Sequence, residues 1–348
     1  MPSRETFAYR RNLKLRAQRA VETEDTAIDN VFSRAQDDFL TFCTLLDKPP
    51  ARHMLEWHRE LITGDSNKYL LDIAGPNLDI LSPRGSAKST VLNLFTAWVI
   101  GRHTQAGRPL QIIYCSYNIA TAIPKSRIIK QIIDASTFKK IFPRVKLKAG
   151  MQSDIGWSVD FDYAGIDRIG DEEFTLRAAG LRGAITSKRA HLVIVDDAIK
   201  SSSDIKNPAV REEMNNNWSS VIAPIVFEGG RSICLGTRFH PLDIHKTMFV
   251  PQRGWKQVAQ EALTYDKEGE PISYWPEQWS VEYLQGQKEL DPVAFAYQYQ
   301  QQPVMTSDLV LSPDLIVKGT VETEFDSLAV GIDLSASKNE TSDYTAFV

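Results

Sequence analysis

The sequence has few of the features that mark disulfide-stapled, membrane-spanning or nucleic-acid-coating proteins. Its 348 residues include only three cysteines, without paired spacing, so we expect buried thiols rather than disulfides or a zinc site. No apolar run approaches the roughly 20 residues that span a bilayer. The Arg-rich N-terminus lacks the apolar segment of a secretory signal. A formal net charge of −4 argues against a protein that passively coats nucleic acid.

Length and composition predict a globular chain of more than one domain. Hydrophobic residues make up 43% and charged residues 24%, as in ordinary globular proteins. Six basic side chains within residues 4–19 suggest either an arm that binds DNA phosphates or a partner, or simply a solvated helix. We expect an N-terminal helical arm or lid over 1–60, an α/β core over 61–254, a smaller subdomain and linker over 255–324, and the start of another domain over 325–348.

The most informative segment is a strand-like run, a loop of small residues and an apolar helix. Residues 78–81 have the strand pattern, and Lys-Ser-Thr leads into the helix expected over 91–100. This order suits a phosphate-binding loop, because N–H groups of a tight turn and of a helix N-terminus converge on phosphate oxygens. Lys88 would reach the β- and γ-phosphates, and Ser89 a Mg²⁺ ion. The expected nucleotide-binding residues are Ser82, Pro83, Arg84, Gly85, Ser86, Ala87, Lys88, Ser89 and Thr90.

The loop departs from the usual G-x-x-x-x-G-K-S/T pattern. Ser82 and Ala87 stand at the two glycine positions, so only Lys88 and Ser89 match strictly. A Ser-rich loop that merely caps a core helix, with Ser86 or Ser89 as the N-cap residue, is the structural alternative. The phosphate-binding and helix-capping interpretations can be distinguished only by motifs further along the chain.

A second motif ends an apolar strand in two carboxylates. Residues 191–195 are followed directly by Asp196 and Asp197. Such a run is typical of a central strand of a parallel sheet, and ligands of open α/β sheets bind at the carboxyl ends of these strands. We expect Asp196 to hold Mg²⁺, usually through water, and Asp197 to orient or deprotonate the attacking water. A turn that caps a helix is the alternative for an Asp pair in this position.

The third motif is the strand 231–236, which ends in Gly-Thr-Arg. A small hydroxyl residue at the end of a strand beside the Asp-Asp strand can sense the γ-phosphate. Thr237 is the candidate sensor, with Arg238 and His240 as weaker candidates. Pro241 is expected to start a helix, so a plain strand-to-helix turn is the alternative.

These motifs predict an α/β fold, a three-layer domain around a mainly parallel sheet. Its central strands are expected at residues 78–81, 110–117, 191–195 and 231–236, with a helix over 118–134 after the second.

The motifs resemble those of the large terminase subunit of tailed bacteriophages, a DNA-packaging motor. Ser-Pro-Arg-Gly-Ser-Ala-Lys-Ser-Thr is similar to that family's variant P-loop (Walker A), Val-Ile-Val-Asp-Asp-Ala-Ile-Lys to its Mg²⁺ strand (Walker B), and Leu-Gly-Thr-Arg-Phe-His-Pro-Leu-Asp-Ile to its coupling motif. Residues 274–277 and 295–303 resemble the family's passage out of the ATPase. Residues 331–334 and 342–346 resemble the opening hairpin of its ribonuclease H-like nuclease, so the resemblance covers roughly residues 50–348.

The resemblance implies an ASCE-type P-loop ATPase that uses ATP and Mg²⁺ to drive double-stranded DNA into a procapsid, followed by a nuclease that uses two divalent metals. It implies contacts with a portal protein and a small terminase subunit, a homo-oligomeric ring assembled from monomers, no membrane, and a place in the cytoplasm of an infected bacterium. Arg84 is implied to stabilise transition-state charge in cis, and Arg127 to do so in trans. Asp333 matches the first nuclease carboxylate and metal ligand; Asp343 is either a metal ligand or a hairpin support.

The nuclease part departs from the family's pattern. The sequence ends five residues after Asp343, before the three or four carboxylates of a ribonuclease H-like site can be gathered. We therefore expect a complete ATPase, an incomplete nuclease and no DNA cleavage. Two alternatives stay open: another P-loop motor such as a helicase, which usually carries two such cores or further arginine motifs, and a non-enzymatic scaffold in which the Lys88 loop is incidental.

Overall fold

The computed structural model of the chain describes residues 24–62, 75–108, 110–160, 174–183, 185 and 189–303, with two short strands at 332–333 and 346–347. The chain divides into two compact units, 1–304 and 305–348. The predicted basic arm at 4–19 and Asp343 lie outside the described residues. Within the described residues, no helix has both the length and the apolar character needed to cross a membrane.

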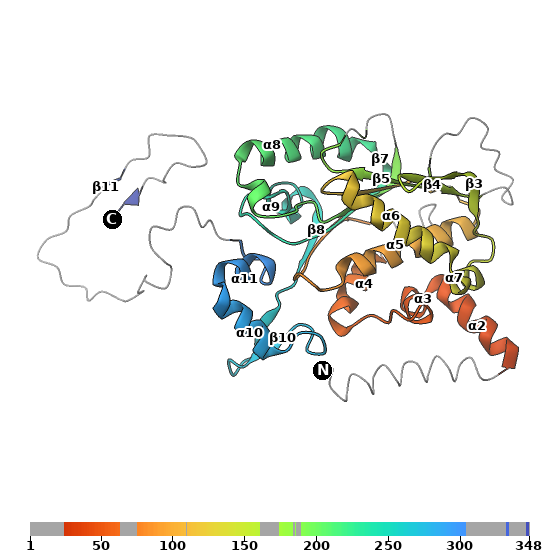
Figure 1. Cartoon of the computed structure of the whole chain (residues 1–348), viewed down its shortest axis with the longest axis horizontal. Helices are drawn as coiled ribbons and strands as arrows, with labels where there is room; N and C mark the ends of the chain where they lie inside the picture. Colours follow the sequence, from red (N-terminus) through yellow and green to blue (C-terminus); the bar gives the residue numbers. More distant parts are fainter. Residues whose placement is uncertain are drawn as a thin grey trace, which may run out of the picture. The chain divides into compact units, whose positions relative to one another are not determined.

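The first unit is organised around an eight-stranded sheet (Figure 1). Its strands are β1 (Asn77–Leu81), β2 (Ile112–Ser116), β3 (Leu147–Gln152), β4 (Gly156–Val159), β5 (Leu176–Gly180), β6 (Ala190–Asp196), β7 (Val226–Gly236) and β8 (Trp255–Ala259). In space they follow the order β3-β4-β5-β2-β6-β7-β1-β8. Every neighbouring pair from β5 to β8 is parallel, and the β3–β4 and β4–β5 pairs are antiparallel.

The strand order confirms the predicted fold class. The four predicted strands are β1, β2, β6 and β7, although β7 begins at Val226, five residues earlier than expected. The phosphate-loop strand β1 is separated from the Asp-Asp strand β6 by β7 alone, which is the arrangement of an ASCE-type P-loop ATPase. The carboxyl ends of β1, β6 and β7 therefore meet at one edge of the sheet.

Strand β8 carries the sheet beyond residue 254, where the sequence predicted the core to end. It pairs in parallel with β1, with Asn77 opposite Trp255 and Ile80 opposite Val258. Of its five side chains only Trp255 and Val258 are buried. An edge strand with so little apolar content gives a weak sequence signal, and this explains why it was not predicted.

Alternate residues of the central strands enter two separate hydrophobic cores on opposite faces of the sheet. Tyr114 and Ile194 belong to the first core, and their neighbours Cys115 and Val195 belong to the second. Successive side chains of a strand point to opposite faces, so a strand covered on both sides becomes a continuous apolar run. The apolar pattern that predicted these strands follows directly from their two-sided burial.

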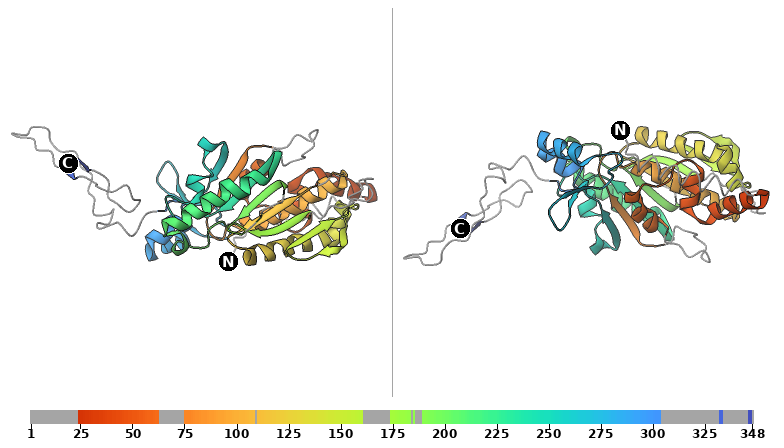
Figure 2. Two further views of the ribbon diagram at one scale, coloured as in Figure 1. Left: turned by 90° about the horizontal axis from the view of Figure 1, so that it is seen from above. Right: turned by 90° about the horizontal axis from the view of Figure 1, so that it is seen from below.

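Helices cover both faces and complete the three layers (Figures 1 and 2). The first core is covered by α2 (Glu24–Asp37), α3 (Phe39–Leu45), η1 (Arg52–Met54), α4 (Leu55–Leu61), α5 (Lys88–Gln105), α6 (Ile119–Asp134) and α7 (Ser136–Ile141). Phe39 of α3 and Trp98 of α5 are fully buried, with ring centroids 5.3 Å apart. The N-terminal helices thus share a core with the sheet.

The second face is covered by η3 (Ser203–Ile205), α8 (Pro208–Asn217), η4 (Trp218–Ile222), η5 (Ala223–Ile225) and α9 (Ile244–Thr247). The short helix η6 (Pro251–Arg253) follows and buries no side chain. The prediction that Pro241 starts a helix is wrong, because α9 begins at Ile244. The Asp243 carboxylate accepts hydrogen bonds from the N–H groups of Phe239 and His240 and also caps α9. These bonds hold residues 239–243 in a turn, so the helix begins only at Ile244.

The smaller subdomain that follows β8 has its own hydrophobic core. It contains β9 (Leu263–Tyr265), β10 (Pro271–Ser273), α10 (Val281–Leu290) and α11 (Pro292–Gln298), with β9 and β10 antiparallel. Its buried hydrophobic side chains are Ala262, Leu263, Leu284 and Phe295. The aromatic run predicted to pack as a helix forms α11 at its start, with Phe295 buried.

The second unit contains β11 (Ile332–Asp333) and β12 (Ala346–Phe347), which pair antiparallel with Asp333 opposite Ala346. Both strands fall within the segment predicted to form an opening hairpin. The metal-binding role of Asp333, the role of Asp343 and the expected lack of DNA cleavage stay predictions.

Candidate active site

The phosphate loop connects β1 to α5 at the edge where β1, β6 and β7 end. Its first N–H, that of Ser82, donates to the Gly236 carbonyl at the end of β7 (3.1 Å). Gly85 and Ala87 both have left-handed backbones, with φ of 78° and 59°. The turn at Ala87 lets α5 begin at Lys88, so the first N–H groups of a five-turn helix face the loop.

The structural alternative, in which a serine caps α5, is wrong. The N-cap residue is Ala87, and no side chain makes a capping hydrogen bond there. The Ser89 hydroxyl donates instead to Asp196 Oδ1 (2.9 Å). The buried Ser86 hydroxyl has no hydrogen-bond partner among the described residues. The open helix end and this unpaired hydroxyl suit a loop that receives an external acceptor such as phosphate.

Lys88, Thr237 and Asp197 come together as the sequence predicted. Lys88 is 7% exposed, and its Nζ donates to Thr237 Oγ1 at 3.0 Å. The Thr237 hydroxyl donates in turn to the Ser82 carbonyl (3.2 Å). Asp197 Oδ1 lies 3.8 Å from Lys88 Nζ. The ammonium group is therefore held between the end of β7 and the acidic pair that follows β6.

The Asp196 carboxylate is completely buried at the end of β6. Ser89 binds Oδ1, while the Tyr114 hydroxyl (3.1 Å) and Lys125 Nζ (3.2 Å) lie beside Oδ2. Burial and then the neighbouring Asp197 raise the pKa of Asp196, and Lys125 acts in the opposite direction. Tyr114 and Lys125 were not predicted as site residues. Both follow from the pairing of β2 with β6 and the packing of α6 on β2, which a linear motif does not reveal.

Asp197 differs from its neighbour in exposure and backbone conformation. Its φ is 53°, in the left-handed region, and its side chain is 49% exposed. Its N–H donates to the Leu235 carbonyl (2.9 Å), and its carbonyl accepts from the Tyr117 N–H (3.1 Å). The two backbone bonds fix this conformation and leave the carboxylate accessible to water.

The oxygen atoms of Ser89 and Asp196 form a donor set that fits Mg²⁺, because this cation prefers hydroxyl, carboxylate and water oxygens.

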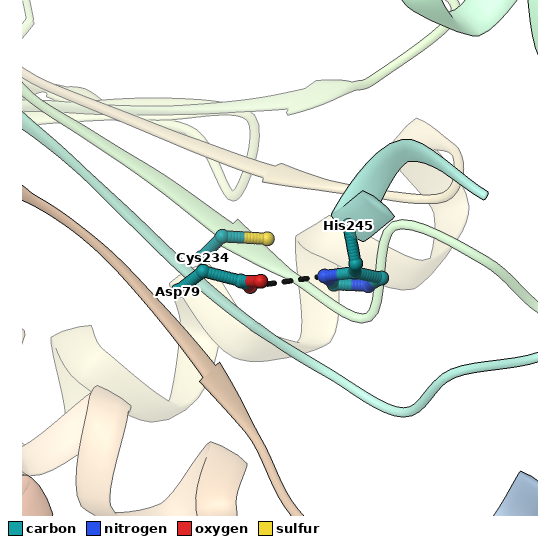
Figure 3. A group of neighbouring side chains, drawn as sticks. All are labelled: Asp79, Cys234 and His245. Atoms are coloured by element: carbon teal, nitrogen blue, oxygen red, sulfur yellow. Dashed lines mark hydrogen bonds and ion pairs between the residues drawn. The ribbon is translucent and has the colours of Figure 1, made fainter. Parts of the chain in front are cut away.

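A second group, Asp79, Cys234 and His245, brings three possible ligand atoms within 4.8 Å of one another (Figure 3). Here Asp79 is already bonded by His245 Nδ1 (2.9 Å) and Gln257 Nε2 (2.8 Å). These contacts join β1, α9 and β8.

The hydrogen bond between Asp79 and His245 also affects the pKa of this buried histidine. Burial alone would lower the pKa of His245, but the Asp79 carboxylate raises it above its usual value. We interpret the group of Asp79, Cys234 and His245 as a structural clamp that fixes α9 behind Thr237.

The two arginines with predicted catalytic roles contact other parts of the chain. The Arg84 N–H donates to the Gln298 carbonyl (3.0 Å), and its guanidinium lies 3.4 Å from Gln298 Oε1. Arg127 donates to Asp154 Oδ2 through Nε (3.0 Å) and Nη2 (2.8 Å). Hydrogen bonds from Lys130 and then Arg127 lower the pKa of Asp154. The cis and trans roles of the two arginines stay predictions.

The weaker sensor candidates, Arg238 and His240, belong to the turn after β7. Arg238 Nε lies 2.9 Å from the Asp243 carboxylate, and Nη2 donates to the His240 carbonyl (3.1 Å). His240 Nδ1 accepts the Leu242 N–H (2.9 Å). Their side chains thus stabilise the turn that holds Thr237 in place.

Amide side chains connect the site to the subdomain. Besides the Arg84–Gln298 contacts, the Arg238 N–H donates to Gln301 Oε1 (3.2 Å). The Ser82 hydroxyl donates to Gln260 Oε1 (3.2 Å). The loop 82–87 and the residues just after β7 therefore both contact the segment that leads out of the sheet domain.

No family model matches this chain. The large terminase subunit of Enterobacteria phage T3 is 25% identical to it over 283 residues. Over this region the chain is similar to a phage large terminase subunit. The match covers 76% of this chain and 44% of the T3 protein, so the chain spans less than half of that relative's length.

Solved structures of large terminases are similar to this chain at low sequence identity. A variant of the ATPase domain of the Thermus phage P74-26 large terminase gives a TM-score of 0.48 and 13% identity, covering 76% of this chain and 98% of that one. The large terminase of a thermophilic bacteriophage in complex with ADP gives 0.39 and 8%, covering 74% and 56%. The bacteriophage Phi-29 genome packaging motor assembly gives 0.32 and 14%, covering 75% and 69%. All three TM-scores are below 0.5, and the fold is established by the strand order and loop described above.

Proposed function

We propose that this chain hydrolyses ATP with Mg²⁺ and uses the energy to move double-stranded DNA into a procapsid. The ATPase part is carried by one observation: the contacts Lys88–Thr237 and Ser89–Asp196 at the carboxyl ends of three neighbouring parallel strands. The packaging part is supported by the similarity to the T3 large terminase subunit.

Nucleotide binding is assigned to the loop 82–87 and the start of α5. The N–H groups at the N-terminus of α5 and the positive end of the helix dipole favour phosphate oxygens. Lys88 adds a nearly buried positive charge, and charge-assisted hydrogen bonds in such a site are stronger than neutral ones. The unpaired Ser86 hydroxyl supplies a further donor in the same loop.

Metal binding and water activation are divided between the two adjacent carboxylates. Ser89 and Asp196 would hold Mg²⁺, and the bound ion would supply positive charge to offset that of the phosphate oxygens. The more exposed Asp197 accepts a hydrogen bond from the attacking water and takes its proton. Burial of one carboxylate and exposure of the other suit these separate roles.

The hydrogen bonds around Thr237 offer a route from hydrolysis to movement. A γ-phosphate that binds Lys88 competes with Thr237, whose hydroxyl now holds that ammonium. The next residue, Arg238, binds Gln301, and Arg84 in the loop binds Gln298. A change of phosphate state at either point is thereby passed to residues 298–301.

The remaining assignments rest on similarity. We propose a portal protein, a small terminase subunit and a procapsid as partners, with assembly of monomers into a ring in the cytoplasm of the infected host. The Arg127 side chain is 53% exposed, which supports a role toward a neighbouring subunit once its bond with Asp154 opens.

Steady-state ATP hydrolysis by variants tests the proposed chemistry. Lys88→Ala and Asp197→Ala should each lower turnover by at least about 100-fold, because each removes a group that acts in the transition state. Lys139→Ala, which removes a surface ion pair with Asp134, is the control and should hydrolyse ATP normally. Normal turnover in either site variant would contradict the role given to that residue.

DNA assays then separate a translocase from a helicase. ATP turnover stimulated by double-stranded DNA, without separation of its strands, is expected. Strand separation in a duplex-unwinding assay would favour the helicase interpretation and contradict packaging.

A further inference from the structure

The negative charge of Asp196 is compensated from inside the chain. Both carboxylate oxygens are fully buried, and an unpaired charge in such a place is strongly destabilising. Ser89 and Tyr114 supply only neutral hydroxyl groups. Among the described residues, Lys125 is the one cationic side chain within 4.0 Å of this carboxylate, at 3.2 Å from Oδ2.

Helix α6 delivers Lys125 to this position. The helix starts just past β2, with Asn118 and Thr121 forming a capping box. Pro124, inside the helix, has no N–H to donate, so the first turns of α6 are held by the cap as much as by the helix ladder. Lys125 follows directly, with its side chain 26% exposed. Its ammonium therefore reaches a buried carboxylate yet retains a way out to solvent.

The other cations of α6 have a different partner. Arg127 and Lys130 both bind Asp154, at 2.8 Å each. Lys125 and Lys130 are the same residue type on the same helix. Lys125 contacts the buried Asp196 carboxylate, whereas Lys130 contacts Asp154.

We propose that Lys125 is the counter-ion of Asp196 in the metal-free state, and that Mg²⁺ displaces it when the site is loaded. The proposal rests on the proposed function, which assigns Asp196 to the metal. A divalent cation held by Ser89 and Asp196 would lie close to the Lys125 ammonium, and two positive charges at that range repel. The ammonium and the metal therefore compete, and Lys125 acts as a positioning residue that neutralises the buried Asp196 carboxylate until the metal binds.

Thermal unfolding without nucleotide tests the first half of the proposal. In EDTA, Lys125→Met should lower Tm by about 5 °C, because Asp196 loses its buried partner. Saturating MgCl₂ should bring the variant to within about 1 °C of the wild type under the same conditions. Lys125→Arg, which keeps the charge, should unfold close to the wild type in EDTA. The matched control is Lys130→Met, whose Tm should not respond selectively to MgCl₂.

A double variant shows whether charge pairing is the cause. Asp196→Asn keeps the shape of the side chain but removes the charge that Lys125 compensates. Combined with Lys125→Met, it should restore part of the Tm lost in EDTA, because the two residues interact directly. Additive losses of Tm would contradict the pairing and overturn the proposal.

Binding of Mn²⁺ alone, measured by electron paramagnetic resonance, tests the competition. Lys125→Met should bind Mn²⁺ at least about fivefold tighter than the wild type, while Lys130→Met should not. An unchanged Mn²⁺ affinity, or the same Tm loss in EDTA and in MgCl₂, would reduce Lys125 to a structural role and overturn the proposal. If Asp196→Asn left the Mn²⁺ binding of the wild type intact, the metal assignment of the proposed function would fail instead, and the Lys125 proposal with it.

Discussion

The sheet domain and the smaller subdomain both contact the phosphate loop, but they are packed very differently. The sheet buries two hydrophobic cores, one on each face, whereas the subdomain buries only Ala262, Leu263, Leu284 and Phe295. The sheet domain holds Lys88 at the start of α5 and Asp196 at the end of β6, and the subdomain reaches the loop through amide hydrogen bonds such as that of Gln298. The difference shows that Lys88 and Asp196 are held by an extensively packed region, while the subdomain is attached to the loop by a few hydrogen bonds that open more easily.

The largest expected effect is on the sheet side of this comparison. Trp98 is fully buried on α5, where its Nε1 donates to the Ala35 carbonyl (3.0 Å). Trp98→Ala should reduce the free energy of unfolding by about 4 kcal/mol, since it leaves a large cavity and an unpaired carbonyl. Urea unfolding followed by circular dichroism measures this loss.

Leu284→Ala is the matched change in the subdomain core and serves as the control. Leu284 is fully buried but has few neighbours in its core. Its loss should open the subdomain locally, seen as faster hydrogen exchange in α10 and α11, without shifting the main urea transition. A shift as large as that of Trp98→Ala would show that the two regions unfold as one.

A smaller effect is expected from acidification of the sheet domain. His58 packs on Phe39 with ring centroids 4.6 Å apart; burial lowers the pKa of His58 from 6.5 to about 4, with a partial upward effect of Asp38. Because the unfolded state takes up the proton first, stability falls as pH drops from about 6.5 toward 4. Between pH 7 and pH 5 this group should cost about 2 kcal/mol. His58→Phe should lose about that much less than the wild type in paired urea titrations, and equal losses would contradict the buried neutral histidine.

The smallest effect is expected at the connection between the two regions. Gln298→Ala removes the exposed side-chain acceptor of Arg84 and should change the free energy of unfolding by less than about 1 kcal/mol. Its influence should appear instead as faster hydrogen exchange in α11. Gln302→Ala, which removes an exposed bond to Glu261 rather than to the loop, is the control. Equal exchange in the two variants would argue against a specific connection at Gln298.

The four strands β1, β2, β6 and β7 could be predicted from the sequence, because strands buried on both faces appear as apolar runs. Asp196 ends β6, Thr237 directly follows β7, and Lys88 follows β1 after a short loop. These residues were therefore predicted together with their strands. Strand β8 was missed, because an edge strand with two buried side chains lacks that signal. The helix expected at Pro241 was displaced by the side-chain bonds of Asp243, which a propensity argument does not include.

The missed site residues depend on tertiary placement. Tyr114 and Lys125 approach Asp196 only because β2 pairs with β6 and α6 packs on β2, and no fixed spacing in the sequence predicts this. A tyrosine near the end of a central strand and a lysine just after a proline in the following helix were the available signals. Both patterns are also common in ordinary packing, so a site role for these two residues can be inferred only once the strand order is known.

The alanine at position 87 shows what holds the loop 82–87 in its shape. A methyl group in the left-handed region costs the folded state about 1 kcal/mol relative to glycine. The N–H groups of Thr90 and Val91 both donate to the Ala87 carbonyl (3.0 and 3.2 Å), and these bonds help to hold the residue in this conformation. The shape of this loop is therefore set by the structure around it rather than by the conformational preference of residue 87.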